Sequence, residues 1–123
     1  MIPLKQSIYQ RVSQVADRVY DSRTPSEKEY PYVNITYPTI GEVDESFRQN
    51  IILELDVWDN LADTTRLENL TDAIDKKLNR YVSNDLYFRI YRLSPYRIEL
   101  DDADENIRRR QLRYQILIFK EEN

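Results

Sequence analysis

The N-terminal part of the chain carries one apolar stripe at helical spacing. Its members recur at steps of four, four, three and four residues: Leu4, Ile8, Val12, Val15 and Val19. Side chains at this spacing share one face of an α-helix. The pattern predicts an amphipathic helix that ends near residues 17–20. A polar loop follows over residues 21–29, where Pro25 and several charged side chains disfavour regular structure.

Two strands are predicted after this loop. Residues 32–37 are rich in β-forming side chains, and the prolines on either side favour a sheet edge. Residues 46–58 give the strongest strand pattern, because apolar and polar side chains alternate at period two. One face is apolar (Phe47, Ile51, Leu53, Leu55 and Val57) and the other is polar (Arg48, Asn50, Glu54 and Asp56). We expect these two strands to pair as an antiparallel hairpin.

The second half of the chain again predicts a helix followed by strands. The helical stripe consists of Leu67, Leu70, Ile74 and Leu78. Thr65 and Glu68 have the spacing of a capping box at the start of this helix. Strand patterns follow over residues 86–93, over residues 96–100 after a Ser-Pro interruption, and over residues 109–120. The last strand places four apolar side chains on one face: Leu112, Tyr114, Ile116 and Ile118.

These elements predict the fold class. Their order is α-β-β-α-β-β within one domain of residues 1–123, which is close to the commonest domain size. The expected architecture is α+β, with an antiparallel sheet of about four strands and two helices packed on one face.

Composition limits the classes of function. The chain has 18 basic and 22 acidic residues, and a net charge of −4 disfavours nucleic-acid binding over the whole surface. It has no cysteine and no histidine, so no disulfide and no thiolate or imidazole metal site is expected. No apolar run has the length of a membrane span, and we expect no membrane partner. The 10 tyrosines have two interpretations: most of them sit half-buried on the faces of the sheet, or they form protein contacts, because tyrosine is enriched at interfaces.

The acidic turn over residues 101–106 was tested as a cation site. Asp102, Asp104 and Asn106 match the start of a calcium-binding loop. However, Ile107 stands where that loop needs glycine, and Arg113 stands where it needs glutamate. The neighbouring carboxylates at positions 54 and 56 share one strand face and were considered as an acid–base pair. Such a pair would need a cleft, and nothing else in the sequence defines one. We therefore expect no catalytic, cofactor-binding or metal-binding residue and no enzyme activity.

The cluster of Arg108, Arg109, Arg110 and Arg113 has two interpretations. It could contact phosphates, with Tyr114 stacking on a base, as in a small nucleic-acid-binding module. It could equally form ion pairs with the acidic turn, across a hairpin or to a neighbouring subunit. The nearby carboxylates would cancel much of the positive field that a nucleic acid meets, which favours ion pairing.

Five segments together resemble a known family: Asp17–Pro25, Tyr30–Ile35, Asn50–Asp59, Leu67–Leu78 and Arg108–Phe119. The chain resembles the small tail completion proteins of long-tailed bacteriophages and prophages, also called tail terminator or tail-to-head joining proteins. The likeness spans nearly the whole chain, although this chain has a single glycine where many relatives carry more in their loops.

The resemblance implies a structural protein of the virion, assembled in the bacterial host cytoplasm. It would form a ring of identical subunits, expected to be a hexamer, at the neck end of the tail. The ring would stop growth of the tail tube and join the tail to the head. Its partners would be the tail tube protein and head-neck connector proteins, and DNA would pass through without specific binding. A neighbouring neck protein, such as a head completion or stopper protein, remains the alternative.

Two polar loops are the candidate contact surfaces with subunits or partners. They lie at residues 21–29 and 101–106, and both are long for connections in a compact domain. The candidate contact residues are Arg23, Glu27, Lys28, Asp101, Asp102, Asp104, Glu105, Arg108, Arg109 and Arg110.

Overall fold

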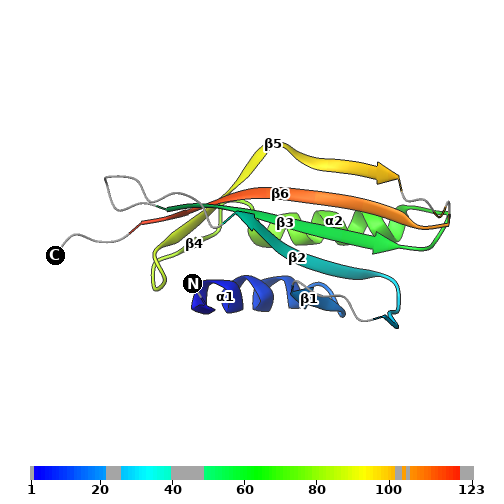
Figure 1. The fold of residues 1–123 in the computed structure, drawn as a ribbon, viewed down its shortest axis with the longest axis horizontal. Coiled ribbons are helices and arrows are strands. Elements are labelled where there is room, and N and C mark those ends of the chain that lie inside the picture. The colour runs from blue at the N-terminus through cyan, green and yellow to red at the C-terminus, as the bar shows by residue number, and fades with distance from the viewer. Residues whose placement is uncertain (1, 22–25, 40–48, 102–103, 105, 120–123) are drawn as a thin grey trace.

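The computed structural model describes residues 2–21, 26–39, 49–101, 104 and 106–119. Within these ranges two helices and six strands follow one another (Figure 1). Their bounds are α1 (Ile2–Ser13), β1 (Val19–Asp21), β2 (Tyr32–Thr39), β3 (Gln49–Asp59), α2 (Thr65–Leu78), β4 (Val82–Ser83), β5 (Phe88–Asp101) and β6 (Arg108–Ile118). Neither helix is long and apolar enough to cross a lipid bilayer.

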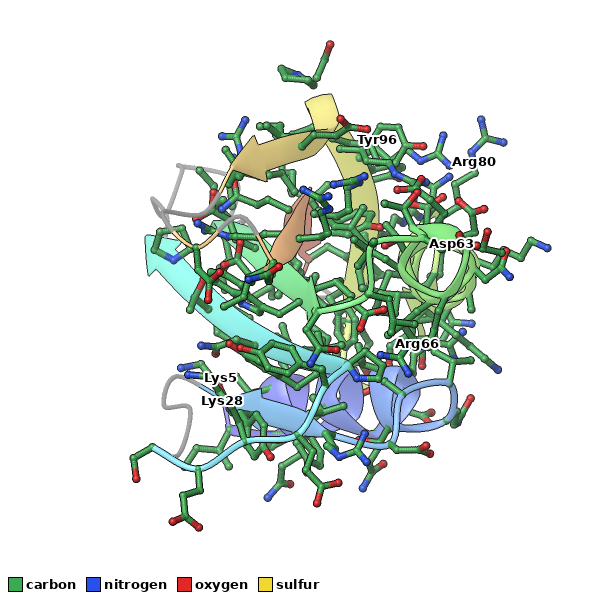
Figure 2. All side chains as sticks on the ribbon, turned by 90° about the vertical axis from the view of Figure 1, so that its right-hand side faces the viewer. Lys5, Lys28, Asp63, Arg66, Arg80 and Tyr96 are labelled. Carbon is green, nitrogen blue, oxygen red and sulfur yellow. The ribbon has the colours of Figure 1, made fainter. Side chains whose placement is uncertain are left out.

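The six strands form one mixed sheet in the order β1-β2-β3-β6-β5-β4. β1 runs parallel to β2, and the other neighbours are antiparallel. Seen from the end of the molecule, the sheet is curled, with α1 and α2 beside it (Figure 2). The expected antiparallel sheet of about four strands and the expected order α-β-β-α-β-β were therefore wrong. β1 has 3 residues and β4 has 2, too few to give a periodic signal in the sequence.

The core lies between the inner face of this sheet and both helices. The alternation predicted for β3 is confirmed, because Ile51, Leu53, Leu55 and Val57 are all at most 1% exposed. On β6, Leu112, Tyr114 and Ile116 are fully buried, and Leu55 lies opposite Leu112 in the β3–β6 register. Six helical side chains close the core from the other side: Leu4, Ile8, Val12, Leu67, Ile74 and Leu78.

α1 ends earlier than its apolar stripe predicts. The helix stops at Ser13, and the N–H of Val15 and of Ala16 both bond the Val12 carbonyl in a final turn. Beyond it the chain becomes extended, because the Val33 N–H of β2 bonds the Arg18 carbonyl at 2.9 Å. Val19 is buried as expected, but from a strand rather than from the helix. Pairing with a neighbouring strand therefore overrides the helical pattern at this point.

The two strand patterns on either side of the Ser-Pro dipeptide belong to one strand, β5. Its register against β6 shifts between Arg92 and Arg97, so the interruption is a bulge within the strand and not its end. Pro95 is accommodated there because β4 pairs with β5 only at Phe88 and Arg89, which leaves the later part of β5 at the sheet edge.

The capping box expected at the start of α2 is absent. Thr64 occupies the N-cap position without a side-chain hydrogen bond, and the Asp63 carboxylate accepts the Thr65 N–H at 2.8 Å instead. At the other end, the Arg11 side chain of α1 donates to the Lys77 carbonyl at 2.8 Å. This bond satisfies one of the carbonyls that a helix end leaves without an intrahelical partner, and it places a cation where the helix dipole is negative.

A buried carboxylate ends β3. Asp59 is 1% exposed and accepts hydrogen bonds from Arg66 Nε at 2.9 Å and from the Asn60 N–H at 2.8 Å. Burial alone would raise the pKa of Asp59, but these hydrogen bonds and the charge of Arg66 outweigh burial and lower it. A carboxyl with a lowered pKa stabilises the folded state above its unfolded pKa of about 4, and this contribution is lost as the pH falls through the folded pKa.

We therefore expect Asp59→Asn to lower the free energy of unfolding by about 1–2 kcal/mol at pH 7. The difference between variant and wild type should shrink as the pH falls below about 4, the pKa of the unfolded carboxyl, toward the lower pKa of folded Asp59. Urea unfolding at pH 7 and pH 3 measures both values, with Asp85→Asn as an exposed control. An equal loss at the two pH values would exclude a contribution from the charge of Asp59.

Candidate assembly surface

The two polar loops singled out in the sequence are described only in part. The start of β2, the end of β5 and the start of β6, which flank them, all lie at the right-hand end in Figure 1. Three candidate residues fall outside the described part of the chain: Arg23, Asp102 and Glu105. The side chain of Asp101 is also not described. Glu27 and Lys28 are exposed at this end.

A stack of cations and aromatic rings connects these two regions across the outer face of the sheet. Lys28 Nζ lies 5.7 Å from the centre of the Tyr32 ring, and the Tyr32 and Trp58 rings stack with centroids 6.0 Å apart. Arg109 Cζ lies 4.8 Å from the centre of the Trp58 ring. The register explains this order, because Tyr32 lies opposite Trp58 and Trp58 lies opposite Arg109. We call Lys28, Tyr32, Trp58 and Arg109 the aromatic stack.

Two more tyrosines extend the aromatic stack. The Tyr20 ring of β1 meets the Tyr32 ring edge-on at 6.0 Å, and the Tyr30 ring lies 5.4 Å from it. Tyr32 itself is 4% exposed, whereas Tyr20, Tyr30 and Trp58 are half-buried and present part of their rings to solvent. Tryptophan, tyrosine and arginine are the residue types that dominate binding energy at protein interfaces. The sequence indicated a tyrosine-rich surface, but only strand pairing shows which rings assemble.

The rest of the outer face is polar and internally paired. Arg113 Nε donates to Glu54 at 3.2 Å, and Arg109 forms an ion pair with Asp56 at 2.7 Å. Gln111 also donates to Asp56, at 3.2 Å. The two carboxylates considered as an acid–base pair are therefore both engaged by side chains of β6. Both carboxylates lie on the polar face predicted for this strand, opposite the buried face.

The arginine cluster does not form one basic surface. Successive side chains of a strand point to opposite faces, so Arg109 and Arg113 lie on the outer face while Arg110 points toward α2. Arg110 is 8% exposed, and its Nε donates to Glu68 at 2.7 Å. Of the consecutive three, only Arg108 is exposed, whereas Arg109 is half-buried.

The partners of these arginines are not those that the sequence suggested. The carboxylates come from β3, α2 and, for Arg110, also β5, where Glu99 lies at 3.5 Å. In the acidic turn, the Asp104 carboxylate accepts the Asn106 backbone N–H at 3.0 Å. Among the described residues, Arg109, Arg110 and Arg113 therefore pair with carboxylates of neighbouring strands and α2, whereas the side chains of residues 101, 102 and 105 in the acidic turn lie outside the described part of the chain.

A polar network between α2 and the sheet was missed in the sequence. Asp75 is 7% exposed; it accepts a hydrogen bond from the Tyr114 hydroxyl at 2.7 Å and accepts two more from Arg92, from Nε and Nη2 on one edge of the guanidinium. Burial and the hydrogen bond to Asp75 raise the pKa of Tyr114, which keeps this hydroxyl protonated as a donor. The available signal was the position of Asp75, directly after Ile74 on the apolar stripe of α2.

Two more carboxylates on the same face of α2 form ion pairs with an arginine of β5. Arg97 donates to Glu68 at 2.5 Å and to Asp72 at 2.6 Å, and Glu68 also accepts from Arg110. The glutamate expected to cap the helix thus binds two arginines of the sheet instead. Among the described residues no three potential metal ligands gather in one place.

Among the comparisons with known proteins, the comparison with solved structures gives a match. No protein-family model matches the sequence. No curated protein matches it either. Among solved structures, a chain described as part of the virion of a native gene transfer agent particle is similar in fold, with a TM-score of 0.66. The match covers 90% of this chain and 90% of that chain at 14% sequence identity, so the curled sheet with its two helices is a fold that both chains share.

Proposed function

We propose that this chain is a structural protein of a phage-like virion. The observation that carries the proposal is the fold shared with a chain of a gene transfer agent virion over 90% of both chains. A fold by itself is compatible with several functions. The aromatic stack adds an argument from the site, because it offers rigid contact area of the kind found in protein interfaces. The proposed role is one of assembly, without catalysis.

The finer proposal is a ring of identical subunits at the neck end of the tail. The whole-chain sequence pattern supports it, because the five segments that resemble tail completion proteins include β3, α2 and β6. Such a ring would end growth of the tail tube and join the tail to the head through the connector proteins. Rings are built by repeating one heterologous contact between subunits. A neighbouring neck protein, at the head completion or stopper level, is supported by the same observations.

Binding of nucleic acid through the arginine cluster is the less favoured alternative. Arg109, Arg110 and Arg113 each have a carboxylate partner, and Arg110 is buried. A phosphate would have to displace these carboxylates. Fluorescence anisotropy with double-stranded DNA at low salt is expected to detect no binding. Binding that weakens steeply as salt is added would favour this alternative.

Assembly of the purified chain tests the proposed function. We expect mass photometry and negative-stain images to show a ring whose population rises with protein concentration. Tail tubes assembled with the tube protein alone should bind it at their ends and stop growing. A protein that stays monomeric at every concentration and does not bind tube ends would contradict the proposal.

A further inference from the structure

The end of the molecule opposite the aromatic stack carries unneutralised positive charge. Four cations lie at the end of α2, just after it and on the first part of β5: Lys76, Lys77, Arg80 and Arg89. Among the described residues none of the four has a carboxylate partner, whereas five arginines further along β5 and β6 do: Arg92, Arg97, Arg109, Arg110 and Arg113. Lys76, Lys77, Arg80 and Arg89 therefore keep their positive charge at this end, where Asp85 is an exposed carboxylate between β4 and β5.

Backbone pairing holds Arg80 and Arg89 on one surface, next to exposed apolar side chains. Val82 lies opposite Arg89, and the Arg80 N–H bonds the Ile90 carbonyl at 2.9 Å, which continues the same register. Val82, Tyr87 and Tyr91 are 43%, 38% and 41% exposed. We call the surface formed by Arg80, Val82, Tyr87, Arg89 and Tyr91 the basic end.

Exposed carboxylates lie at the other end, beside the aromatic stack. Asp17 follows α1, Glu27 precedes β2, and Asp63 precedes α2. Asp17 also lines a hollow of about 520 Å³ between the end of α1 and α2, together with Arg18 and Arg66, whose charges are paired with Glu29 and Asp59. We call Asp17, Glu27 and Asp63 the acidic end. The 14 residues of α2 span about 21 Å, and the helix runs along the long axis of Figure 1 from the right-hand end toward β4.

We infer that the basic end of one copy packs against the acidic end of a second copy. This inference rests on the proposed function and names the surfaces of its repeating contact. A heterologous contact needs two different, complementary patches on separate parts of one chain, and these two ends meet that requirement. Opposite charges set orientation and register, while the aromatic side chains at both ends supply contact area that is removed from water.

Lys76 and Lys77 have a second explanation within the chain. Cations in the last turn of a helix compensate the negative end of its dipole. Arg80 lies beyond α2 and Arg89 lies on β5, so the helix dipole does not account for either. The arginines are therefore the residues to change, and Asp63 is left intact because its carboxylate caps α2.

Charge exchange between the two ends tests the inference. The basic-end variant is Arg80→Glu with Arg89→Glu, and the acidic-end variant is Asp17→Lys with Glu27→Lys. Each variant alone is expected to need at least about tenfold more protein to assemble, because its contact brings like charges together. An equimolar mixture is expected to regain assembly at the wild-type concentration, since the reversed surfaces are complementary. Gln6→Glu with Gln10→Glu adds negative charge on exposed positions of α1 and should leave assembly unchanged.

The outcomes separate this inference from the proposed function. If the wild type does not assemble at any concentration, the proposed function fails. If the wild type assembles and the reversed variants assemble equally well, or if their mixture does not recover, only the inferred contact is wrong. Circular dichroism checks that each variant is folded. The wild-type protein alone gives a second test. Its assembly should weaken as the salt concentration is raised from about 50 to 500 mM, because salt screens the charges of the contact. Stronger assembly at high salt would overturn the inference.

Discussion

Replacing Asp75 by alanine is expected to lower the free energy of unfolding by about 2–3 kcal/mol. The carboxylate is buried, and it is the acceptor for the hydroxyl of Tyr114, which is fully buried in the core. Without Asp75 this hydroxyl keeps its desolvation cost and loses its partner. Arg92 contributes less to the loss, because its side chain is 41% exposed and can be hydrated. Urea unfolding followed by circular dichroism measures the change.

Two further variants show whether the hydrogen bond is the cause. Asp72→Ala removes an exposed ion pair from the same helix and should cost less than about 1 kcal/mol. Asp75→Ala combined with Tyr114→Phe removes both partners, so the double variant should be more stable than Asp75→Ala alone. A double variant that is less stable by the sum of the two single losses would show that the two side chains act independently.

Replacing Trp58 by alanine is expected to weaken assembly of the proposed ring, so that at least about 30-fold more protein is needed. An interface anchor of this type typically contributes about 2 kcal/mol or more per contact, and each 1.4 kcal/mol corresponds to a factor of ten. Trp58 holds the aromatic stack together, because Tyr32 packs on one side of it and Arg109 on the other. Mass photometry over a dilution series measures the shift in assembly.

Two controls distinguish a lost contact from a damaged fold. Trp58→Phe keeps a ring for Tyr32 to stack on and should retain most of the assembly. Tyr9→Ala removes an aromatic ring that is 40% exposed on α1, outside both ends, and should change assembly little. If Tyr9→Ala impairs assembly as strongly as Trp58→Ala, the aromatic stack is not the contact surface. Thermal unfolding of each variant shows whether the monomer remains folded.

The longer elements could be predicted because each one has enough residues to repeat its pattern. From Asn50 to Asp59, buried and outward-facing side chains of β3 alternate, and the predicted apolar residues from Ile51 to Val57 are buried, whereas Phe47 and Arg48 lie outside the described residues. The same holds for β6 from Leu112 to Ile116. For α2, Leu67, Ile74 and Leu78 are buried at the expected positions. The amphipathic spacing is sufficient in these segments because side-chain burial repeats with the geometry of the backbone.

The short elements and the site depended on partners distant in sequence. β1 and β4 exist because neighbouring strands offer backbone hydrogen bonds, and their own side chains give no periodic signal. The arginine cluster is evident in the sequence as consecutive basic residues. Its partners, however, are 42 residues away in the sequence for Arg110 and 53 residues away for Arg109. Strand register decides which carboxylates they meet, and register is a property of the assembled sheet.

The sequence by itself therefore determined which side chains avoid water in α2, β3 and β6, since spacing along one segment is a local property. It also indicated two polar loops and a tyrosine-rich surface. Only the tertiary structure decided that β1 is parallel, that Arg110 turns inward to Glu68, and that Lys28, Tyr32, Trp58 and Arg109 stack together. The physical reason is that these contacts join segments whose distance in space is set by the packing of the whole sheet against both helices.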